Sequence, residues 1–417
     1  MPDKFSAPPP LAVLCVGLGA VTTTLIAGVE AIKRSLGRPV GSLTQMEQVG
    51  LGKTQTLAEA LALTPLSQLV FGAWDIRPDN AFVAATTAKV LDPGLLNALK
   101  PTLEAIYPLP GVFDPNWLPA MEATHIKGER GHRAKAEALR RDIRGFLSTH
   151  GCERGVLIWC ASTEVHHELA SCHLDLPAFE RALDTDDPAL SPTQLYAWAA
   201  IKEGLPFVNG SPNSALELPA LRTLATKERV PVAGSDFKTG QTMVKTALAP
   251  MLRQRLLGVN GWFSTNILGN RDGEVLRHVG ALANKARTKI GVLSGILDGN
   301  EYPELYGELE HQVHINYYPP RGDAKESWDN VDLFGWLGYP MQIKVDFQCR
   351  DSILAAPVAL DTVLFLDMAK QQGWSGIQDW LGFYFKAPEI CNGRLPVHAL
   401  ADQYRILWKT LTLLMQE

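Results

Sequence analysis

The chain has 417 residues, which is too many for one simple core and predicts two domains of ordinary size. An apolar content of 46% and a charged content of 20% are typical of a folded globular protein. The net charge of −5, a pI of about 6.1 and the lack of a basic block argue against nucleic-acid binding. Six scattered cysteines without a C-x-x-C pair argue against a disulfide framework or a structural zinc site, and favour the cytoplasm.

The apolar run at residues 11–31 has two interpretations. Its composition suggests a membrane helix or a signal peptide, but Gly17, Gly19 and three threonines interrupt it, and no A-x-A-like cleavage site closes it. We therefore expect no membrane segment here. The run instead predicts a buried strand at 11–17, a glycine turn and a helix from about 22 to 36, which is how a dinucleotide-binding fold begins.

Further apolar strands alternate with helical stretches, which predicts a parallel sheet covered on both faces. The predicted strands are residues 69–76, 155–162, 206–211 and 230–236, with a helix at 132–148. From 237 to 350 the pattern changes, because 311–319 and 341–349 are aromatic and alternating, as in antiparallel or mixed sheets. The segment after Asp351 is helical again.

The predicted fold class is therefore α/β, a Rossmann-like doubly wound parallel sheet with an inserted α+β domain. We expect residues 1–236 to form the first part of the Rossmann-like domain and 237–350 to form the insertion. Residues 351–417 then return to the first domain.

A glycine loop and an acid are candidates for dinucleotide binding. The loop G-L-G-A-V-T-T at 17–23 follows the first strand, and its glycines allow a tight turn close to a pyrophosphate. A third glycine is absent, and the hydroxyls of Thr22 and Thr23 are candidates to donate to phosphate. Asp75 ends the next clear strand, and an acid there favours NAD over NADP because it repels a 2′-phosphate. A plain turn and a helix N-cap are the alternatives.

Polar loops and lysines gather in the second half of the chain. Loops at 209–214, 234–242 and 268–273 follow predicted strands, and such loops bind cofactors and substrates in parallel sheets. Lys285 and Lys289 share one helix face, where the alternative is a solvated surface. Lys386 lies among aromatic residues, where burial would lower its pKa and prepare it as a base; a lysine that extends to solvent is the alternative.

A second group of polar residues contains types that can bind a metal. His166, His167, Glu168 and His173 lack the H-E-x-x-H order of a zinc helix, so we predict no metal site.

Several motifs resemble those of the inositol-3-phosphate synthases (also called myo-inositol-1-phosphate synthases), in the bacterial form. GSDFKTGQT is similar to G-D-D-F/L-K-S-G-Q-T, NILGNRDG to N-H-L-G-N-N-D-G, and RDSILAAPVALD to E-D-S-L-L-A-A-P-x-x-L-D. GAWDI, WCASTE, FVNGSPNS and FKAPEI match further segments in the same order. The resemblance runs from about residue 11 to the C-terminus.

The resemblance implies an isomerase that converts glucose 6-phosphate into an inositol monophosphate with bound NAD, in a cytoplasmic homotetramer. The inserted domain would carry catalysis and the tetramer contacts. The implied NAD-binding residues are Gly17, Gly19, Ala20, Val21, Thr22, Asp75, Ile76, Ala161, Gly210, Asp236, Asn270 and Asp272. The implied catalytic residues are Lys285, Lys289, Lys325, Lys386 and Asp351, and those implied to hold substrate are Lys238, Thr239, Lys289 and Lys325.

The family reaction assigns a hypothetical role to each of these lysines. The sugar is oxidised at C5, enolised at C6, closed by an aldol step onto C1 and reduced again. Lys285 would handle the proton of the C5 oxygen, and Lys386 and Lys325 would stabilise oxyanions and assist enolisation and closure. Lys289 would contact phosphate, and Asp351 would orient or neutralise a lysine.

The sequence departs from the family motifs at Ser235, Ile267, Arg271 and Arg350. Arg271 is the largest departure, because it would introduce a cation beside the expected nicotinamide. Three alternatives therefore stay open: a net NAD-dependent sugar-phosphate dehydrogenase, a non-catalytic NAD-binding homologue, and a related cyclase with a different sugar phosphate or product isomer.

Overall fold

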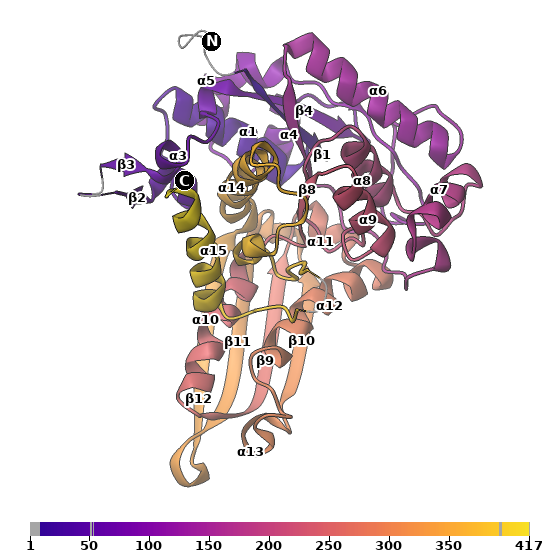
Figure 1. Cartoon of the computed structure of the whole chain (residues 1–417). Helices are drawn as coiled ribbons and strands as arrows, with labels where there is room; N and C mark the ends of the chain where they lie inside the picture. The colour runs from indigo at the N-terminus through magenta and orange to yellow at the C-terminus, as the bar shows by residue number, and fades with distance from the viewer. Residues whose placement is uncertain (1–8, 51, 53, 392–393, 417) are drawn as a thin grey trace.

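The structure is a computed structural model that describes residues 9–416 apart from 51, 53 and 392–393; the side chains of Asp272 and of residues 286–290 also lie outside the described part. The described residues form two large sheets, one above the other in Figure 1, and a two-stranded ribbon. The ribbon consists of β2 (Gln48–Val49) and β3 (Gln55–Thr56).

The larger sheet has seven strands in the order β13-β8-β7-β6-β1-β4-β5, and neighbouring strands pair in parallel. The strands are β1 (Leu11–Val16), β4 (Leu69–Asp75), β5 (Leu109–Pro110), β6 (Arg154–Trp159), β7 (Phe207–Asn209), β8 (Pro231–Gly234) and β13 (Gly376–Ile377). The predicted parallel sheet is confirmed. The apolar run at 11–31 is also confirmed as a strand, a turn and the start of a helix.

Helices cover both faces of this sheet. One face carries α1 (Ala20–Lys33), α4 (Ala81–Ala88), α5 (Pro93–Glu104) and α14 (Asp351–Gln371), and the other carries α6 (His132–His150), α7 (Leu176–Asp184), α8 (Pro192–Lys202) and α9 (Pro219–Lys227). Alternate residues of β1 divide between the two cores, with Val13 and Cys15 in one and Leu14 and Val16 in the other. Because both faces are buried, the strand reads as an unbroken apolar run.

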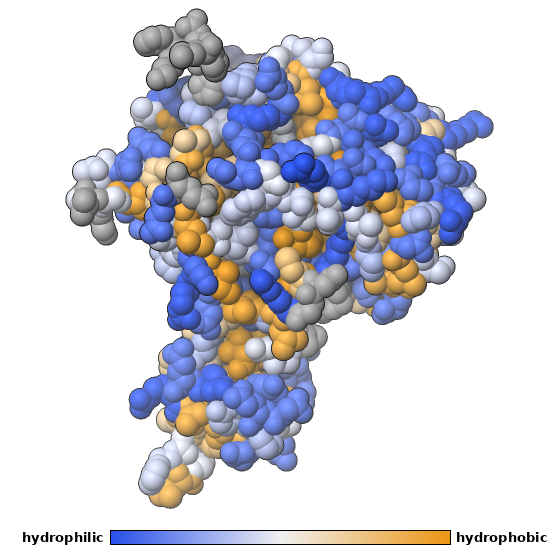
Figure 2. Space-filling model, in the orientation of Figure 1, coloured by the Kyte–Doolittle hydropathy of each residue, from blue (hydrophilic) through white to orange (hydrophobic). Residues whose placement is uncertain are grey.

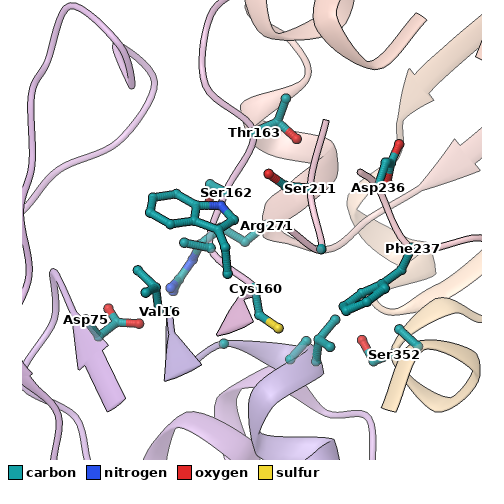
Figure 3. A pocket seen from close by; sticks show the side chains of 18 of the residues that line it. Val16, Asp75, Cys160, Ser162, Thr163, Ser211, Asp236, Phe237, Arg271 and Ser352 are labelled. Atoms are coloured by element: carbon teal, nitrogen blue, oxygen red, sulfur yellow. The ribbon is translucent and has the colours of Figure 1, made fainter. Parts of the chain in front are cut away.

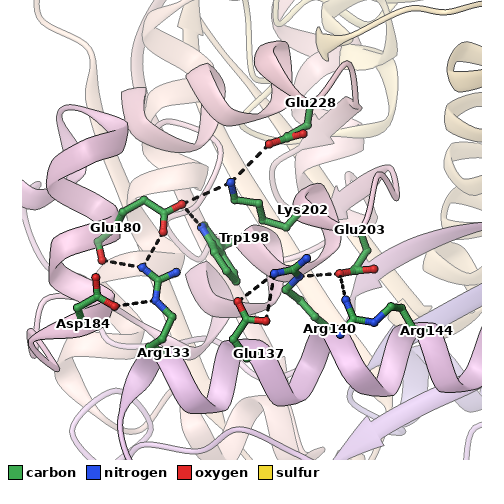
Figure 4. A network of polar contacts seen from close by, with 10 residues as sticks. All are labelled: Arg133, Glu137, Arg140, Arg144, Glu180, Asp184, Trp198, Lys202, Glu203 and Glu228. Atoms are coloured by element: carbon green, nitrogen blue, oxygen red, sulfur yellow. Dashed lines mark hydrogen bonds and ion pairs between the residues drawn. The ribbon is translucent and has the colours of Figure 1, made fainter.

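A polar network joins α6 to α7 and α8 on the outer side of the first sheet (Figure 4). Arg133 binds Asp184 at 2.8 Å, and the indole N–H of Trp198 donates to Glu180 at 3.0 Å. The guanidinium groups of Arg133 and Arg140 lie 5.2 and 5.7 Å from the centroid of the Trp198 ring. Because such partly exposed ion pairs contribute about 0–1 kcal/mol each, we assign the network to helix packing.

Helix α14 is long and apolar enough to cross a membrane, but 78% of its most apolar window is buried inside the fold. It packs against α1 and β6 and is therefore a core helix. Its buried Asp361 accepts hydrogen bonds from the Ser42 hydroxyl at 2.6 Å and the Leu43 N–H at 2.7 Å. The helix predicted after Asp351 is confirmed.

The second sheet has four strands in the order β10-β9-β11-β12. Its strands are β9 (Gly258–Leu268), β10 (Glu310–Tyr317), β11 (Ala324–Phe334) and β12 (Pro340–Arg350). The β10–β9 pair is parallel and the other two pairs are antiparallel, so the predicted mixed sheet is confirmed. One face packs on α10 (Gly240–Gln254), α12 (Val279–Ser294) and α13 (Pro303–Tyr306) around a small apolar core.

The hairpin between β11 and β12 extends away from the first sheet at the bottom of Figure 1. Its tip carries Trp336, Leu337 and Tyr339, which are 86%, 79% and 70% exposed. Figure 2 shows apolar residues at this end of the molecule.

The remaining elements are α2 (Leu43–Met46), α3 (Leu57–Ala60), α11 (Arg271–Val275), α15 (Leu400–Leu414) and the 3-10 turns η1 (Leu66–Gln68), η2 (Ser171–His173), η3 (Pro319–Arg321), η4 (Trp336–Gly338) and η5 (Asp379–Tyr384).

A buried carboxylate fixes α10 on the second sheet. Asp329 of β11 accepts hydrogen bonds from the Trp262 indole at 2.7 Å, the Ser264 hydroxyl at 2.6 Å and the Gln241 amide at 3.0 Å. The Lys245 ammonium lies 3.9 Å from the same carboxylate, and both side chains are buried. Because Gln241 lies in the first turn of α10, this carboxylate holds that turn in place.

Replacing Asp329→Asn should lower the free energy of unfolding by about 3 kcal/mol, because it leaves a buried lysine without its counter-charge. The double variant Asp329→Asn/Lys245→Met should recover part of that loss. Urea unfolding measures both changes, and Asp332→Asn, at an exposed position of the same strand, is the matched control. Equal stability of Asp329→Asn and the unmodified chain would contradict this account.

Candidate active site

The loop after β1 brings two backbones close together. Gly17 has a φ of +88°, and a Cβ at this position would lie 2.7 Å from the Cα of Ala161. Only glycine fits there without strain. Gly19 precedes α1 without a side-chain capping bond, so the first N–H groups of the helix are free to bind an anion.

The two threonines of this loop correct one prediction. The Thr22 hydroxyl donates to the carbonyl of Gly17 at 2.6 Å, and the Thr23 hydroxyl donates to the carbonyl of Gly19 at 2.9 Å. Both side chains are buried. They close the turn at the start of α1 and do not line the pocket, so the prediction that their hydroxyls donate to phosphate is wrong.

Asp75 ends β4, which lies beside β1 in the sheet. Its carboxylate accepts hydrogen bonds from the N–H groups of Leu18 at 2.6 Å and Arg77 at 2.9 Å. Burial raises the pKa of this carboxyl, and the two N–H groups oppose that shift. An acid at this strand end is placed to bind the ribose hydroxyls of a dinucleotide.

A buried carboxylate binds two lysines at the end of β8. One oxygen of Asp236 accepts hydrogen bonds from the ammonium groups of Lys285 and Lys386, each at 3.0 Å. Asp236 has a left-handed backbone with a φ of +62°, a conformation that functional residues adopt more often than others. Burial alone would raise the pKa of Asp236, but the two amines outweigh it and lower the pKa to about 2.

Lys386 is buried in the same cluster. Burial lowers the pKa of its amine, and the nearby amines of Lys285 and Lys325 lower it further, while Asp236 and Asp351 oppose the shift. The lowered pKa agrees with the expectation from its aromatic surroundings. Three of the four lysines predicted to be catalytic therefore lie around two carboxylates, and they come from different parts of the chain.

Asp351 holds the third lysine at the start of α14. Its carboxylate lies 2.8 Å from the Lys325 ammonium. Burial opposes ionisation of Asp351, but Lys325 and Lys386 hold its pKa below the usual range. Gly240 at the start of α10 has a φ of +53°, and a Cβ there would lie 3.4 Å from the Asp351 carboxylate. The backbone of α10 therefore comes close to the lysine cluster.

Asp323 and Ser352 were not predicted from the sequence. The Asn270 amide and the Ser352 hydroxyl both donate to Oδ1 of Asp323 at 3.1 Å. The other Asp323 oxygen is buried without a hydrogen-bond partner among the described residues, and burial raises the pKa of this carboxyl. Both residues adjoin predicted ones in the motifs RGDAKES and RDSILAAP, so adjacency was the available signal.

One pocket joins these groups at the carboxyl ends of the parallel strands (Figure 3). Its empty space is about 1360 Å³, open mouth included. The predicted residues that line it are Gly17, Gly19, Ala20, Val21, Asp75, Ile76, Ala161, Gly210, Asp236, Thr239, Asn270, Lys285, Asp351 and Lys386. Unpredicted residues of the wall include Ser162, Ser211, Phe237 and Ser352.

Lys238 does not belong to this pocket, so its prediction as a substrate-binding residue is wrong. Its ammonium donates to Gln403 and lies 5.4 Å from the centroid of the Phe383 ring. Burial lowers its pKa to about 7. The reason is the extended backbone before α10, where Thr239 faces the pocket and its neighbour Lys238 faces the opposite side.

The remaining predicted residues have different positions. Lys325 lies behind Asp351 and does not form part of the pocket wall. The side chains of Lys289 and Asp272 lie outside the described residues. The histidine group is dispersed: His173 binds backbone groups, and His167 packs on Trp117 with ring centroids 4.5 Å apart.

Three of the four departures from the family motifs have defined contacts or positions. Ser235 bonds to Asn209 and Glu389, and the Arg350 side chain donates to the carbonyl of Val90. Arg271 lines the pocket near Asp75, whereas Asp236 with its lysines lies at the opposite end (Figure 3). The expectation that this cation lies beside the nicotinamide stays a prediction.

Comparison with known proteins agrees with this geometry. Residues 11–412 match the family described as myo-inositol-1-phosphate synthase. An inositol-3-phosphate synthase of Bacteroides thetaiotaomicron is 49% identical over 405 residues, which cover 96% of this chain and 94% of that protein. The human inositol-3-phosphate synthase 1 is 35% identical over 95% of this chain and 76% of its own length.

Two solved structures share the fold. The inositol-3-phosphate synthase of Caenorhabditis elegans superposes with a TM-score of 0.91 at 26% identity, covering 98% of this chain and 86% of that one. A related protein of Thermotoga maritima has a TM-score of 0.77 at 19% identity, covering 97% and 98%. The family match over nearly the whole chain and the identity to the bacterial enzyme establish that this chain belongs to the NAD-dependent myo-inositol-1-phosphate synthase family.

Proposed function

We propose that the pocket converts D-glucose 6-phosphate into 1D-myo-inositol 3-phosphate, an isomerisation by oxidation, enolisation, ring closure and reduction. The observation that carries the proposal is the pair of lysines on one buried carboxylate, which lines the same pocket as the glycine loop. Bound NAD would supply the hydride acceptor for the first step and the hydride donor for the last.

The residues of the pocket fit such a cofactor. The backbone of Gly17 to Val21 leaves room for a pyrophosphate at the free end of α1, and Asp75 is placed for the adenosine ribose. The predicted residues Ala161, Gly210, Asp236 and Asn270 line the continuation of the pocket toward the lysines. Together they would hold the nicotinamide end next to the sugar.

Lys285 and Lys386 would divide the proton transfers. Three amines share the two carboxylates Asp236 and Asp351, so three ammonium groups would leave an excess positive charge in a buried site. A neutral amine on one of them is therefore favoured, which provides a base beside an acid. Lys285 would take the proton of the C5 hydroxyl, and Lys386 would assist enolisation at C6.

Lys325 and the start of α10 would complete the substrate site. Asp351 fixes the Lys325 ammonium, which would stabilise the oxyanion that develops during closure onto C1. Thr239 precedes α10 without a side-chain capping bond, so the free N–H groups of that helix suit a phosphate. Lys289, which the sequence spacing puts on the same helix face as Lys285, would add a cation for the same phosphate.

The test incubates the protein with NAD and glucose 6-phosphate, and follows phosphorus NMR and NADH absorbance together. We expect inositol monophosphate without net NADH. Lys386→Met should lower turnover by at least about 100-fold while NAD still binds, because the proton transfers lose a group. Lys100→Met, at an exposed position on α5, is the matched control.

Three results would contradict the proposal. NADH that accumulates in step with product would indicate the alternative, a net sugar-phosphate dehydrogenase. Near-normal turnover of Lys386→Met would remove Lys386 from the mechanism. A different inositol phosphate or a preferred different sugar phosphate would indicate the related cyclase.

We also propose the limits of the domains, the assembly and the location. All four strands of the second sheet fall inside 237–350, which supports an insertion between residues 1–236 and 351–417.

The face of the second sheet opposite α10 and α12 carries exposed aromatic residues: Phe263 stacks on Trp328 and His314 at 5.7 and 4.9 Å between centroids. We assign this face to homotetramer contacts. Cys15, Cys152 and Cys172 are buried without a disulfide, which supports a cytoplasmic location.

Sedimentation velocity tests the assembly. The unmodified chain should sediment as a tetramer, and Trp328→Asp should shift it to smaller species, because it places a charge in the apolar centre of the contact. Tyr107→Asp, at a residue 66% exposed on the first domain, should leave the tetramer intact. A tetramer that survives Trp328→Asp would place the contact elsewhere.

A further inference from the structure

Arg271 is a cation in the pocket wall that no step of the mechanism uses. It begins α11, shortly after the second-sheet strand β9, and lines the same pocket as the glycine loop. Figure 3 shows its guanidinium group directed toward Val16 and Asp75, the ends of β1 and β4. Its side chain is exposed and has no hydrogen bond or ion pair with another described residue.

The guanidinium of Arg271 forms no salt bridge with a carboxylate of the described residues. Each oxygen of Asp75 accepts one backbone hydrogen bond, from the N–H groups of Leu18 and Arg77. Arg271 is near enough to lower the pKa of Asp75 against the effect of burial, yet the pair does not form a salt bridge. The donors of Arg271 therefore face the space between the glycine loop and Asp75.

That space is where a dinucleotide would place its phosphates. The free N–H groups of α1 begin at Ala20, and Asp75 marks the ribose end, so a bound dinucleotide would pass beneath Arg271. A guanidinium group is suited to phosphate, because its planar array of donors matches two phosphate oxygens at once.

We propose that Arg271 binds a phosphate of the cofactor, and so clamps the dinucleotide from the second-sheet side of the pocket. This inference rests on the proposal that the pocket is the cofactor site. The same chemistry has two sources at this place: the pyrophosphate at the start of α1, and the 2′-phosphate of NADP beside Asp75. A departure from the family motif thus becomes a specific contact of this chain.

The test titrates NAD and NADP into four proteins by isothermal calorimetry, at low and high salt. The variants are Arg271→Gln, Arg271→Lys and the control Arg277→Gln, which removes the same charge from an exposed position outside the pocket. We expect Arg271→Gln to weaken binding about tenfold, the loss of one charge-assisted hydrogen bond. Arg271→Lys should retain part of the affinity, and the salt dependence should be smaller in Arg271→Gln.

The two dinucleotides distinguish the sources. A loss for both indicates the pyrophosphate, and a loss for NADP alone indicates the 2′-phosphate; either result supports the inference. Unchanged affinity for both dinucleotides in Arg271→Gln, or an equal loss in Arg277→Gln, would overturn it while leaving the cofactor site in place. If the unmodified protein bound neither dinucleotide, the cofactor site itself would fail, and this inference with it.

Discussion

The site depends on one buried carboxylate that carries more amines than it can neutralise. Asp236 sits at the end of β8 and binds Lys285 from α12 and Lys386 from the segment after η5. The first sheet supplies the acid, and segments far along the chain supply the amines. A buried charge is costly when it loses its partner. The fold in which Asp236 meets both lysines is therefore favoured over arrangements that separate them. This fold also keeps an amine with a lowered pKa beside the space for the sugar.

Much of the fold could be predicted because the residue pattern of each strand and turn lies within that element's own sequence. The strand β1 is buried on both faces, which leaves an unbroken apolar run, and the glycine turn after it requires a residue without a side chain at Gly17. Likewise, the alternation in β10 and β12 indicated a sheet with one covered face. The short strands β5 and β13 were not predicted, because two residues at a sheet edge carry no periodicity.

The site could be predicted only in part, because side-chain direction is set by distant contacts. The motif around Asp236 identified the correct loop, but Lys238 lies next to Thr239 on an extended chain and so faces the opposite side, where it donates to Gln403 of α15. The prediction for Thr22 is wrong for a similar reason, because its hydroxyl donates to the carbonyl of Gly17 within the same turn. The position of Arg271 depends on how α11 meets β1 and β4, and nothing in the local sequence specifies that.

The central claim is that Asp236 sets the protonation of the two amines, and the pH profile of kcat/KM in Asp236→Asn tests it most directly. Asp236 is ionised at neutral pH and raises the pKa of Lys386, so removing its charge should lower that pKa further. We predict that the acid-side limb of the profile moves to lower pH and that turnover falls by about 100-fold. A profile and a rate that match the unmodified protein would contradict the claim.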